Sequence, residues 1–258
     1  MEDVVKFIFG ISGNVIALFL FLSPVPTFWR IVKRRSTEDF SGVPYSMALL
    51  NCLLAAWYGL PFVSPNNIPV STVNGAGAAI EVVYVIIFLA FASSQRTRLR
   101  MLVLASAAAA VFAALALVSM LALQGERRKL LCGIAATVCS ICMYGSPLSI
   151  MRLVVKTKSV EYMPFLLSLA VFLSGTSWLV YGLLGRDPFV VIPSAGGSFL
   201  GAVQLILYAI YRNSSGKASA AAADEDMEMM ASNTKQDSNK VKVAHEADGG
   251  AGKEDRLV

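Results

Sequence analysis

The most constraining feature of this chain is an internal duplication. Three short motifs recur at one common offset of 123 positions: Ser23-Pro24 with Ser146-Pro147, Ser36-Thr37-Glu38 with Ser159-Val160-Glu161, and Tyr58-Gly59-Leu60 with Tyr181-Gly182-Leu183. Both copies lie in strongly apolar sequence. A duplicated membrane unit is typical of many transporters, in which two similar halves move about a shared central site. The duplication therefore bears on function as well as on fold.

Hydrophobic length predicts that both copies cross a membrane. The 258 residues are 56% hydrophobic, whereas about half or less is usual for a soluble domain. A helix needs about 20 apolar residues to cross the hydrocarbon core of a bilayer. Seven segments reach this length with little or no charge: Phe7–Trp29, Pro44–Val63, Val70–Ala92, Met101–Leu123, Leu130–Met151, Met163–Leu184 and Phe189–Tyr211. The sequence therefore predicts an all-α membrane protein with seven transmembrane helices.

The seven segments divide into two triplets and one remaining helix. A unit of three transmembrane helices ends on the opposite side of the membrane from where it begins, so two units joined directly would have opposite orientations. One intervening helix returns the chain to the first side and makes the two units parallel. The alanine-rich stretch 105–118 suits this linker. We expect a 3+1+3 arrangement: a first repeat at 1–98, a linker helix at 99–125, a second repeat at 126–212 and a tail at 213–258. The tail is rich in small and charged residues, so we expect it to be disordered in the cytosol.

Basic residues predict the orientation in the membrane. One end of the predicted bundle carries 12 of them: Arg30, Lys33, Arg34, Arg35, Arg96, Arg98, Arg100, Arg152, Lys156, Lys158, Arg212 and Lys217. The other end carries 5: Lys6, Arg127, Arg128, Lys129 and Arg186. The positive-inside bias places the N-terminus outside and the C-terminus in the cytosol, and we expect the plasma membrane. The cluster Arg127-Arg128-Lys129 opposes this bias and has no explanation in the sequence.

Prolines occupy matched places in the two repeats. Four of them lie in or at the edge of predicted membrane helices: Pro24, Pro44, Pro147 and Pro164. Proline removes a backbone donor and kinks or breaks a helix. Pro44 and Pro164 also suit the first turn of a helix, where proline is tolerated. We expect the four prolines to act as hinges that let each repeat bend open on the cytosolic side.

A few residues within the segments are candidates for chemistry. Asn74 carries an amide that is costly in hydrocarbon unless it is paired or hydrated, although a helix–helix bond or an N-cap explains one such residue more simply. Trp178 has Ala55 as its partner at the offset of 123, so a large ring would face a small methyl group across an asymmetric pocket. Glu81 lies deep in a segment without an intramembrane base beside it. We therefore expect a structural hydrogen bond at Glu81 rather than a proton relay.

Enzyme chemistry finds no support in the sequence. It contains no Walker loop, nucleophile–base pair or metal-spaced cluster, and its single histidine, His245, lies in the tail. The four cysteines all fall within hydrophobic segments. Among them, Cys139-Ser-Ile-Cys142 indicates apolar packing more than a redox or zinc site. We expect no cofactor, no metal and no nucleic acid among the partners.

Several longer motifs point to a known family. They are Ser36-Thr-Glu-Asp-Phe-Ser-Gly-Val-Pro44, Leu50-Asn-Cys-Leu-Leu-Ala-Ala-Trp-Tyr-Gly59, Ser146-Pro-Leu-Ser-Ile-Met-Arg152 and Thr176-Ser-Trp-Leu-Val-Tyr-Gly182. With these motifs the chain resembles the SWEET sugar transporters over about residues 4–212. The likeness is strongest to the glucose-preferring branch of plants.

The resemblance implies roles for individual residues. The family's sugar pocket falls on Ala55, Asn74, Trp178 and Ser194, and its proline tetrad falls on Pro24, Pro44, Pro147 and Pro164. Its outer gate falls on Tyr58 with Asp187, and positions that need small residues or bent backbone fall on Gly59, Gly182 and Pro193. The family usually has a second asparagine where this chain has Ser194. A hydroxyl offers one donor on a shorter arm than an amide.

The resemblance implies a passive, bidirectional uniporter for glucose or another hexose, working by alternating access and self-associating into a homo-oligomer. The bulk of Trp178 favours a monosaccharide over a disaccharide. Two alternatives stay open. A proton-coupled amino-acid transporter of the related PQ-loop type would carry Pro-Gln where this chain has Pro24-Val25 and Pro147-Leu148. A receptor or scaffold of the same fold, without transport, is kept open by Ser194 and the long charged tail.

Overall fold

The computed structural model describes residues 2–38 and 40–212. The regular elements in this part of the chain are helices: α1 (Glu2–Leu22), α2 (Val25–Arg34), α3 (Val43–Tyr58), α4 (Ile68–Ala90), α5 (Gln95–Leu121), α6 (Gly125–Met143), α7 (Gly145–Thr157), α8 (Phe165–Leu184) and a final helix, Pro188–Arg212. The expected disordered tail at 213–258 lies outside the described residues, as does His245.

Each of the seven predicted segments coincides with one helix or with a pair of consecutive helices. Among the described residues, six helical stretches are long and apolar enough to cross a membrane, and α3 is a shorter apolar helix. Large apolar side chains such as Leu121 and Leu166 are exposed on the outside of the bundle, as lipid contact requires. The predicted end of the second segment at Val63 is wrong, because the chain turns at Gly59.

Two of the membrane segments are broken near proline. α1 ends at Leu22 and α2 begins at Val25, so the break surrounds Pro24. Pro24 has no N–H to give the carbonyl of Leu20, and that carbonyl instead accepts from the backbone N and the Oγ of Ser23, at 3.2 and 2.7 Å. α6 and α7 are separated in the same way at Tyr144, three residues before Pro147.

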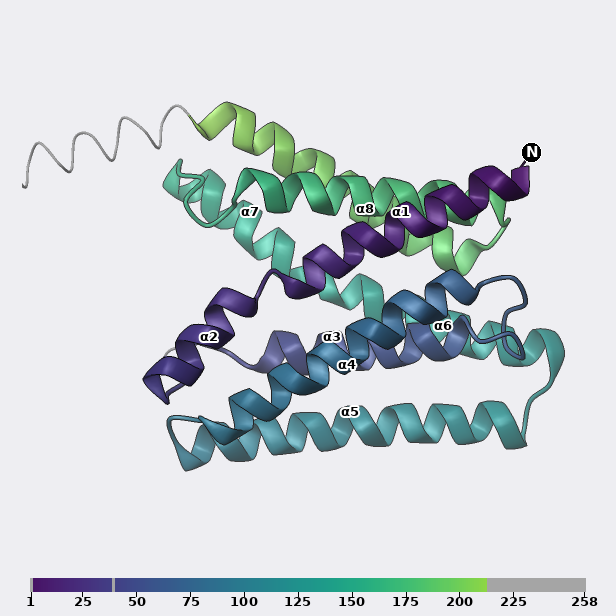
Figure 1. Cartoon of the computed structure of the whole chain (residues 1–258), viewed down its shortest axis with the longest axis horizontal. Coiled ribbons are helices and arrows are strands. Elements are labelled where there is room, and N and C mark those ends of the chain that lie inside the picture. Colours follow the sequence, from purple (N-terminus) through teal and green to yellow (C-terminus); the bar gives the residue numbers. More distant parts are fainter. Residues whose placement is uncertain (1, 39, 213–258) are drawn as a thin grey trace, which may run out of the picture.

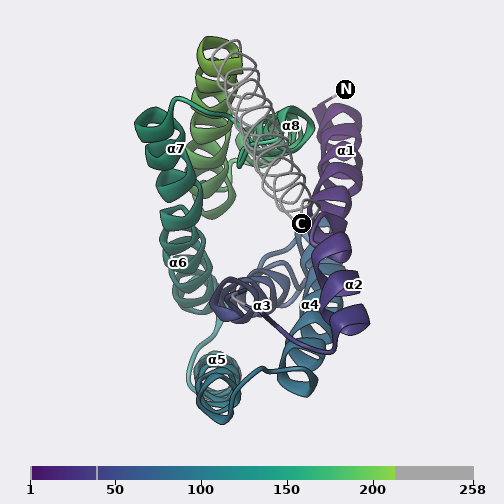
Figure 2. The same ribbon diagram turned by 90° about the vertical axis from the view of Figure 1, so that its left-hand side faces the viewer.

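The helices form two triplets that face the same way. One contains α1 with α2, α3 and α4, and the other contains α6 with α7, α8 and the final helix (Figure 2). The triplets meet where α1 packs on α8 and where α3 packs on α6, two contacts that are equivalent under the offset of 123. Because α1 and α6 both run from the same end of the bundle (Figure 1), the predicted parallel repeats are confirmed.

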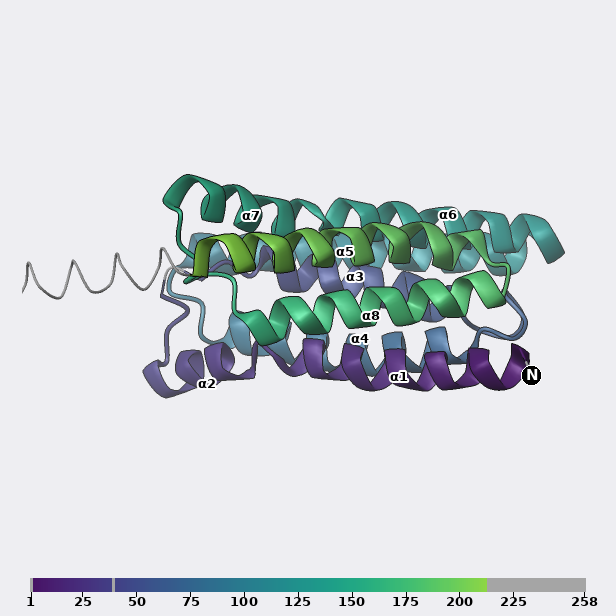
Figure 3. The same cartoon turned by 90° about the horizontal axis from the view of Figure 1, so that it is seen from above.

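The linker helix α5 lies outside both triplets (Figure 2). It begins at the N-cap Ser94, whose side chain accepts from the backbone N of Thr97 at 3.1 Å. It packs mainly on α3, where the indole N–H of Trp57 donates to Ser119 Oγ at 3.0 Å. With an odd number of crossings, the N-terminus and the end of the final helix lie at opposite ends of the bundle (Figure 3).

Arg128 explains part of the basic cluster that opposes the predicted orientation. Its Nε donates to the carbonyl of Ser119 at 2.8 Å, its Nη2 to that of Leu123 at 2.9 Å, and its Nη1 to that of Phe62 at 3.2 Å. The last carbonyls of a helix carry partial negative charge and lack intrahelical donors. Arg128 therefore caps the C-terminal end of α5 and ties it to the loop after α3.

Candidate functional site

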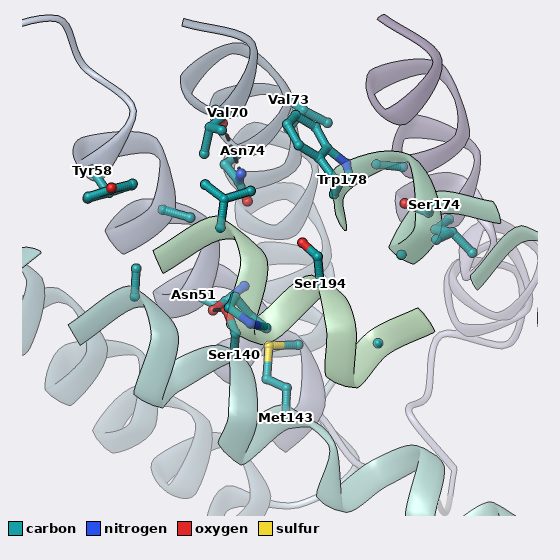
Figure 4. Close-up of a pocket in the computed structure, with 18 of the residues that line it drawn as sticks. Asn51, Tyr58, Val70, Val73, Asn74, Ser140, Met143, Ser174, Trp178 and Ser194 are labelled. Atoms are coloured by element: carbon teal, nitrogen blue, oxygen red, sulfur yellow. Dashed lines mark hydrogen bonds between the residues drawn. The ribbon is translucent and has the colours of Figure 1, made fainter. Parts of the chain in front are cut away.

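A cavity of about 370 Å³ lies between the two triplets. Its walls come from α1, α3 and α4 in the first repeat and from α6, α8 and the final helix in the second. The four residues predicted to form the sugar pocket, Ala55, Asn74, Trp178 and Ser194, all line it. Figure 4 shows Asn74, Trp178 and Ser194 projecting from three different helices around this space.

Asn74 lies in the second turn of α4 and is held by its own helix. Its Nδ2 donates to the carbonyl of Val70 at 2.9 Å. The N-cap alternative for Asn74 is wrong, because Asn67 is the N-cap of α4. An amide has two N–H donors and one acceptor oxygen, and the bond to Val70 uses a single donor. The rest of the amide faces the cavity (Figure 4).

Trp178 is held against α1. A Cβ on Gly13 would lie 2.9 Å from Nε1 and Cε2 of the indole, so the ring needs a glycine at this position of α1. The indole also packs edge-on against Tyr181, with ring centroids 5.3 Å apart. Ala55 lines the same cavity from α3 of the other repeat. The large ring and the small methyl group thus give the two repeats unequal walls.

Ser194 lies in the second turn of the final helix, which is hydrogen-bonded to α6 and to Tyr144, the C-cap of α6. Pro193 has no N–H to give the carbonyl of Phe189, and Thr137 Oγ1 donates to that carbonyl at 3.3 Å. The carbonyl of Pro193 accepts the hydroxyl of Tyr144. Pro193 therefore frees a backbone carbonyl, and a side chain of α6 binds it.

Three further polar residues line the cavity without having been predicted: Asn51, Ser140 and Ser174. Ser140 Oγ donates to Asn51 Oδ1 at 2.8 Å and so links α6 to α3 (Figure 4). Asn51 and Ser174 occupy equivalent positions under the offset of 123. Matched polar residues in otherwise apolar helices are the sequence signal that would have found them.

At the end of the bundle that carries the N-terminus, Tyr58 of the cavity wall belongs to a buried hydrogen-bonded group. We call it the outer cluster, after the outer gate that the family resemblance predicts, and it consists of Tyr58, Ser64, Asn67, Tyr181 and Asp187. Each of these residues is at most 3% exposed. The Tyr58 hydroxyl lies 2.7 and 2.6 Å from the two carboxylate oxygens of Asp187. Asn67 Nδ2 donates to Asp187 Oδ2 at 2.6 Å, and the backbone N of Phe189 donates to Oδ1 at 3.0 Å. Hydrogen bonds to charged groups are stronger than neutral ones, so the carboxylate organises the cluster.

The outer cluster reproduces the pseudo-symmetry of the repeats. Tyr58 of the first repeat binds Asp187 of the second, and Tyr181 of the second binds Asn67 of the first, with its hydroxyl 3.2 Å from Asn67 Oδ1. Asn67 and Asp187 each directly precede the third helix of their repeat. The predicted pair Tyr58 and Asp187 is thus in direct contact, whereas Asn67 and Tyr181 were missed although the repeat pairs the two tyrosines.

The glycines predicted to be critical lie where helices touch backbone to backbone. A Cβ on Gly59 would lie 2.5 Å from the backbone N of Ser71 in α4. A Cβ on Gly182 would lie 3.0 Å from both the backbone N and Cγ2 of Val191. Both glycines therefore permit close contact between the second and third helices of their repeats, and the approach at Gly59 is the tighter of the two.

The four predicted hinge prolines take two kinds of position. Pro24 and Pro147 lie at or just after the breaks in the first helix of each repeat. Pro44 is the second residue of α3, and Pro164 is the N-cap of α8. The latter two therefore begin helices, and the former two accompany kinks.

Glu81 does not belong to the cavity. It is 4% exposed within α4, and its Oε2 has no hydrogen-bond partner among the described residues. The structural hydrogen bond expected at Glu81 is therefore not formed by this oxygen. Glu81 is absent from the cavity wall, which residues 70–74 of α4 reach. Across residues 2–38 and 40–212, no group of three or more His, Cys, Asp or Glu side chains could hold a metal ion.

Comparison with known sequences agrees with this arrangement. A family model described as a sugar efflux transporter for intercellular exchange matches residues 7–96 and 130–216. The chain is 72% identical over 216 residues to the bidirectional sugar transporter SWEET1b of Oryza sativa subsp. indica, covering 84% of this chain and 83% of that one. It is 62% identical over 213 residues to the bidirectional sugar transporter SWEET1 of Arabidopsis thaliana, covering 83% and 86%.

Comparison with solved structures gives the same result. The chain superimposes with a TM-score of 0.80 and 43% identity on the 3.7 Å structure of a eukaryotic SWEET transporter, over 82% of this chain and 99% of that one. The family match covers both repeats and leaves out the linker helix. On these findings, this chain is a member of the SWEET transporter family.

Proposed function

We propose that this protein is a passive, bidirectional uniporter for glucose or another hexose. Its relatives are named bidirectional sugar transporters. The observation that carries the proposal is the cavity between the repeats, which is lined by an amide, an indole and hydroxyl groups and lies beneath the outer cluster. At about 370 Å³, it falls at the small end of the range for ligand pockets, about 300–1,000 Å³. This size suits a monosaccharide better than a disaccharide.

Within this proposal the lining residues have distinct roles. Asn74 and Ser194 offer hydrogen bonds to sugar hydroxyl groups from the third helix of each repeat. Trp178 offers its ring to the apolar face of the sugar and its N–H to an oxygen. Ala55 leaves room opposite the indole. Because Ser194 replaces a longer amide, a bridging water completes the contact on that side.

In this proposal the outer cluster acts as a gate to the cavity, and the prolines act as the hinges about which the helices bend. With Tyr58 bonded to Asp187, the cavity is closed toward the outside, and breaking this contact opens it. Pro24 and Pro147 give the first helix of each repeat a kink about which its inner half bends. Pro44 and Pro164 begin α3 and α8, each of which packs on the first helix of the other repeat. Rocking of two parallel repeats about a central site is the general mode of such carriers.

The charge distribution and the family support the proposed orientation and location. The excess of basic residues at the end that carries α2, α7 and the end of the final helix supports a cytosolic position for that end, with the N-terminus outside. We further propose residence in the plasma membrane and self-association into a homo-oligomer. Glu81 lies away from the cavity wall, so its carboxyl group is not placed to couple proton movement to sugar. This placement favours uniport over a proton-coupled amino-acid transporter.

Replacing Trp178 with alanine is expected to weaken glucose uptake into vesicles that contain the purified protein. Loss of an aromatic contact of about 0.5–1.5 kcal/mol corresponds to a KM about 2- to 10-fold higher. The wider cavity is also expected to admit larger sugars. Radiolabelled uptake measures both effects. Trp29→Ala is the matched control, because Trp29 is 71% exposed. Equal uptake by both variants would show that Trp178 is not part of the binding site.

A further inference from the structure

Two aromatic side chains that the proposed binding site does not use occupy equivalent positions in the repeats. Phe21 precedes Pro24 by three residues, and Tyr144 precedes Pro147 by three. They are related by the offset of 123, and both line the cavity. Each lies at the break in the first helix of its repeat, next to the segment that bends.

Each ring rests on a glycine of the third helix in its own repeat. A Cβ on Gly77 of α4 would lie 2.5 Å from Cζ of Phe21, the tip of the ring. A Cβ on Gly196 of the final helix would lie 2.8 Å from Cε2 of Tyr144. Glycine at these two positions thus leaves a space for the ring, here called its seat, that any larger residue would fill. Each ring therefore packs against the third helix of its own repeat, and both rings line the cavity.

Hydrogen bonds hold both residues in place. The carbonyl of Phe21 accepts the hydroxyl of Tyr84 at 2.9 Å, which ties the break in the first helix to α4. The hydroxyl of Tyr144 donates to the carbonyl of Pro193, the residue before Ser194. The position of the Tyr144 ring is therefore linked to the backbone that carries a proposed sugar contact.

We propose that Phe21 and Tyr144 form the inner gate of the transporter, and that Gly77 and Gly196 hold them in the open position. This inference rests on the proposed function of the cavity. With the outer cluster closed, sugar leaves or enters past the two seated rings. Bending at Pro24 and Pro147 changes the angle between the two halves of each first helix, so the residues beside the breaks shift relative to the third helix of their repeat. The rings then leave their glycine seats and meet across the cavity, which closes it toward the cytosol.

Access to a thiol behind the gate tests this proposal without requiring sugar transport. Ser140 lines the cavity one helical turn before Tyr144. The full chain, with its four cysteines replaced and Ser140→Cys added, is placed in inside-out vesicles and labelled with a membrane-impermeant thiol reagent. Adding Gly77→Ala displaces Phe21 from its seat, and an overpacking cost of about 1 kcal/mol or more predicts labelling at least about fivefold slower.

The matched control is Gly75→Ala, two residues away in the same helix, where an added Cβ meets nothing within 4 Å. Its labelling rate is expected to equal that of the parent. Tyr144→Phe removes the hydrogen bond to Pro193 while keeping the ring, and slower labelling by about 2- to 10-fold is expected. The proposal is overturned if Gly77→Ala labels as fast as Gly75→Ala, or if both slow equally. Sugar uptake by the parent chain is scored separately, so a protein that labels as predicted but carries no sugar would refute only the proposed function.

Discussion

Replacing Asp187 with alanine is expected to reduce sugar transport by at least about tenfold. The carboxylate accepts from Tyr58 and from Asn67 in a buried setting. A hydrogen bond to a charged group contributes about 1.5–3 kcal/mol, so losing two destabilises the outward-closed state by about 3 kcal/mol or more. Because 1.4 kcal/mol is a factor of about ten, that state becomes about 100-fold rarer. A carrier must pass through it in every cycle, and initial rates of glucose uptake measure the loss.

The two equivalent tyrosines provide an internal comparison for this effect. Tyr58→Phe removes one bond to the carboxylate, whereas Tyr181→Phe removes bonds to the neutral oxygens of Asn66 and Asn67. A neutral bond contributes about 0.5–1.5 kcal/mol. Transport is therefore expected to fall more in Tyr58→Phe than in Tyr181→Phe, with Asp187→Ala lowest. The reverse order for the tyrosines, or unimpaired transport by Asp187→Ala, would show that the cluster is not the outer gate.

Replacing Gly59 with alanine is expected to destabilise the fold more than the same change at Gly182 or Gly75. The added Cβ would lie 2.5 Å from the backbone N of Ser71 and 3.0 Å from the carbonyl oxygen of Asn67. Backbone atoms cannot rotate away as a side chain can, so the cost reaches the upper end of the usual overpacking range, about 3 kcal/mol. For a chain of this size, that lowers Tm by roughly 6–12 °C. Thermal unfolding of the detergent-solubilised protein measures it.

The same substitution at two other glycines provides a comparison, with smaller expected losses of stability. Gly182→Ala brings its Cβ to 3.0 Å from Val191, where one of the contacting atoms is a side-chain methyl group, so a smaller loss is expected. Gly75→Ala meets nothing within 4 Å and replaces glycine by a better helix former, so Tm should stay the same or rise. Equal Tm values for Gly59→Ala and Gly75→Ala would contradict the close contact between α3 and α4.

The overall fold could be predicted from the sequence because its two strongest signals are long-range regularities. Hydrophobic length located all seven membrane segments, and the offset of 123 with the parity of three-helix units led to parallel repeats. Local turns were less predictable. The apolar run after α3 continues through Leu60 to Val63, although the chain already turns at Gly59. Hydrophobicity alone does not distinguish the last residues of a helix from an apolar turn that follows it.

Residue chemistry and the repeat offset singled out Asn74 and the pair Trp178 and Ala55, but only the resemblance grouped them with Ser194 in one site. Asn74, Trp178 and Ser194 are brought together by helices far apart in the sequence, so composition gave no means of grouping them. Asn67 was missed because a polar residue before a helix usually serves as its N-cap. In the structure, its side chain instead bonds to a carboxylate of the other repeat. Such a contact depends on how the triplets pack, which no local pattern specifies.

The central claim is that one sugar site between the two triplets opens alternately to the two sides. Counterflow tests it most directly. Vesicles containing the purified protein are loaded with unlabelled glucose and diluted into a trace of labelled glucose, with no ion gradient and a proton uncoupler present. An alternating carrier predicts a transient accumulation of label inside, above its outside concentration. Each unlabelled glucose that leaves brings the binding site to the outer side, where it can bind labelled glucose and carry it in. Label that rises only to equilibrium, or no faster than in vesicles without protein, would contradict the account.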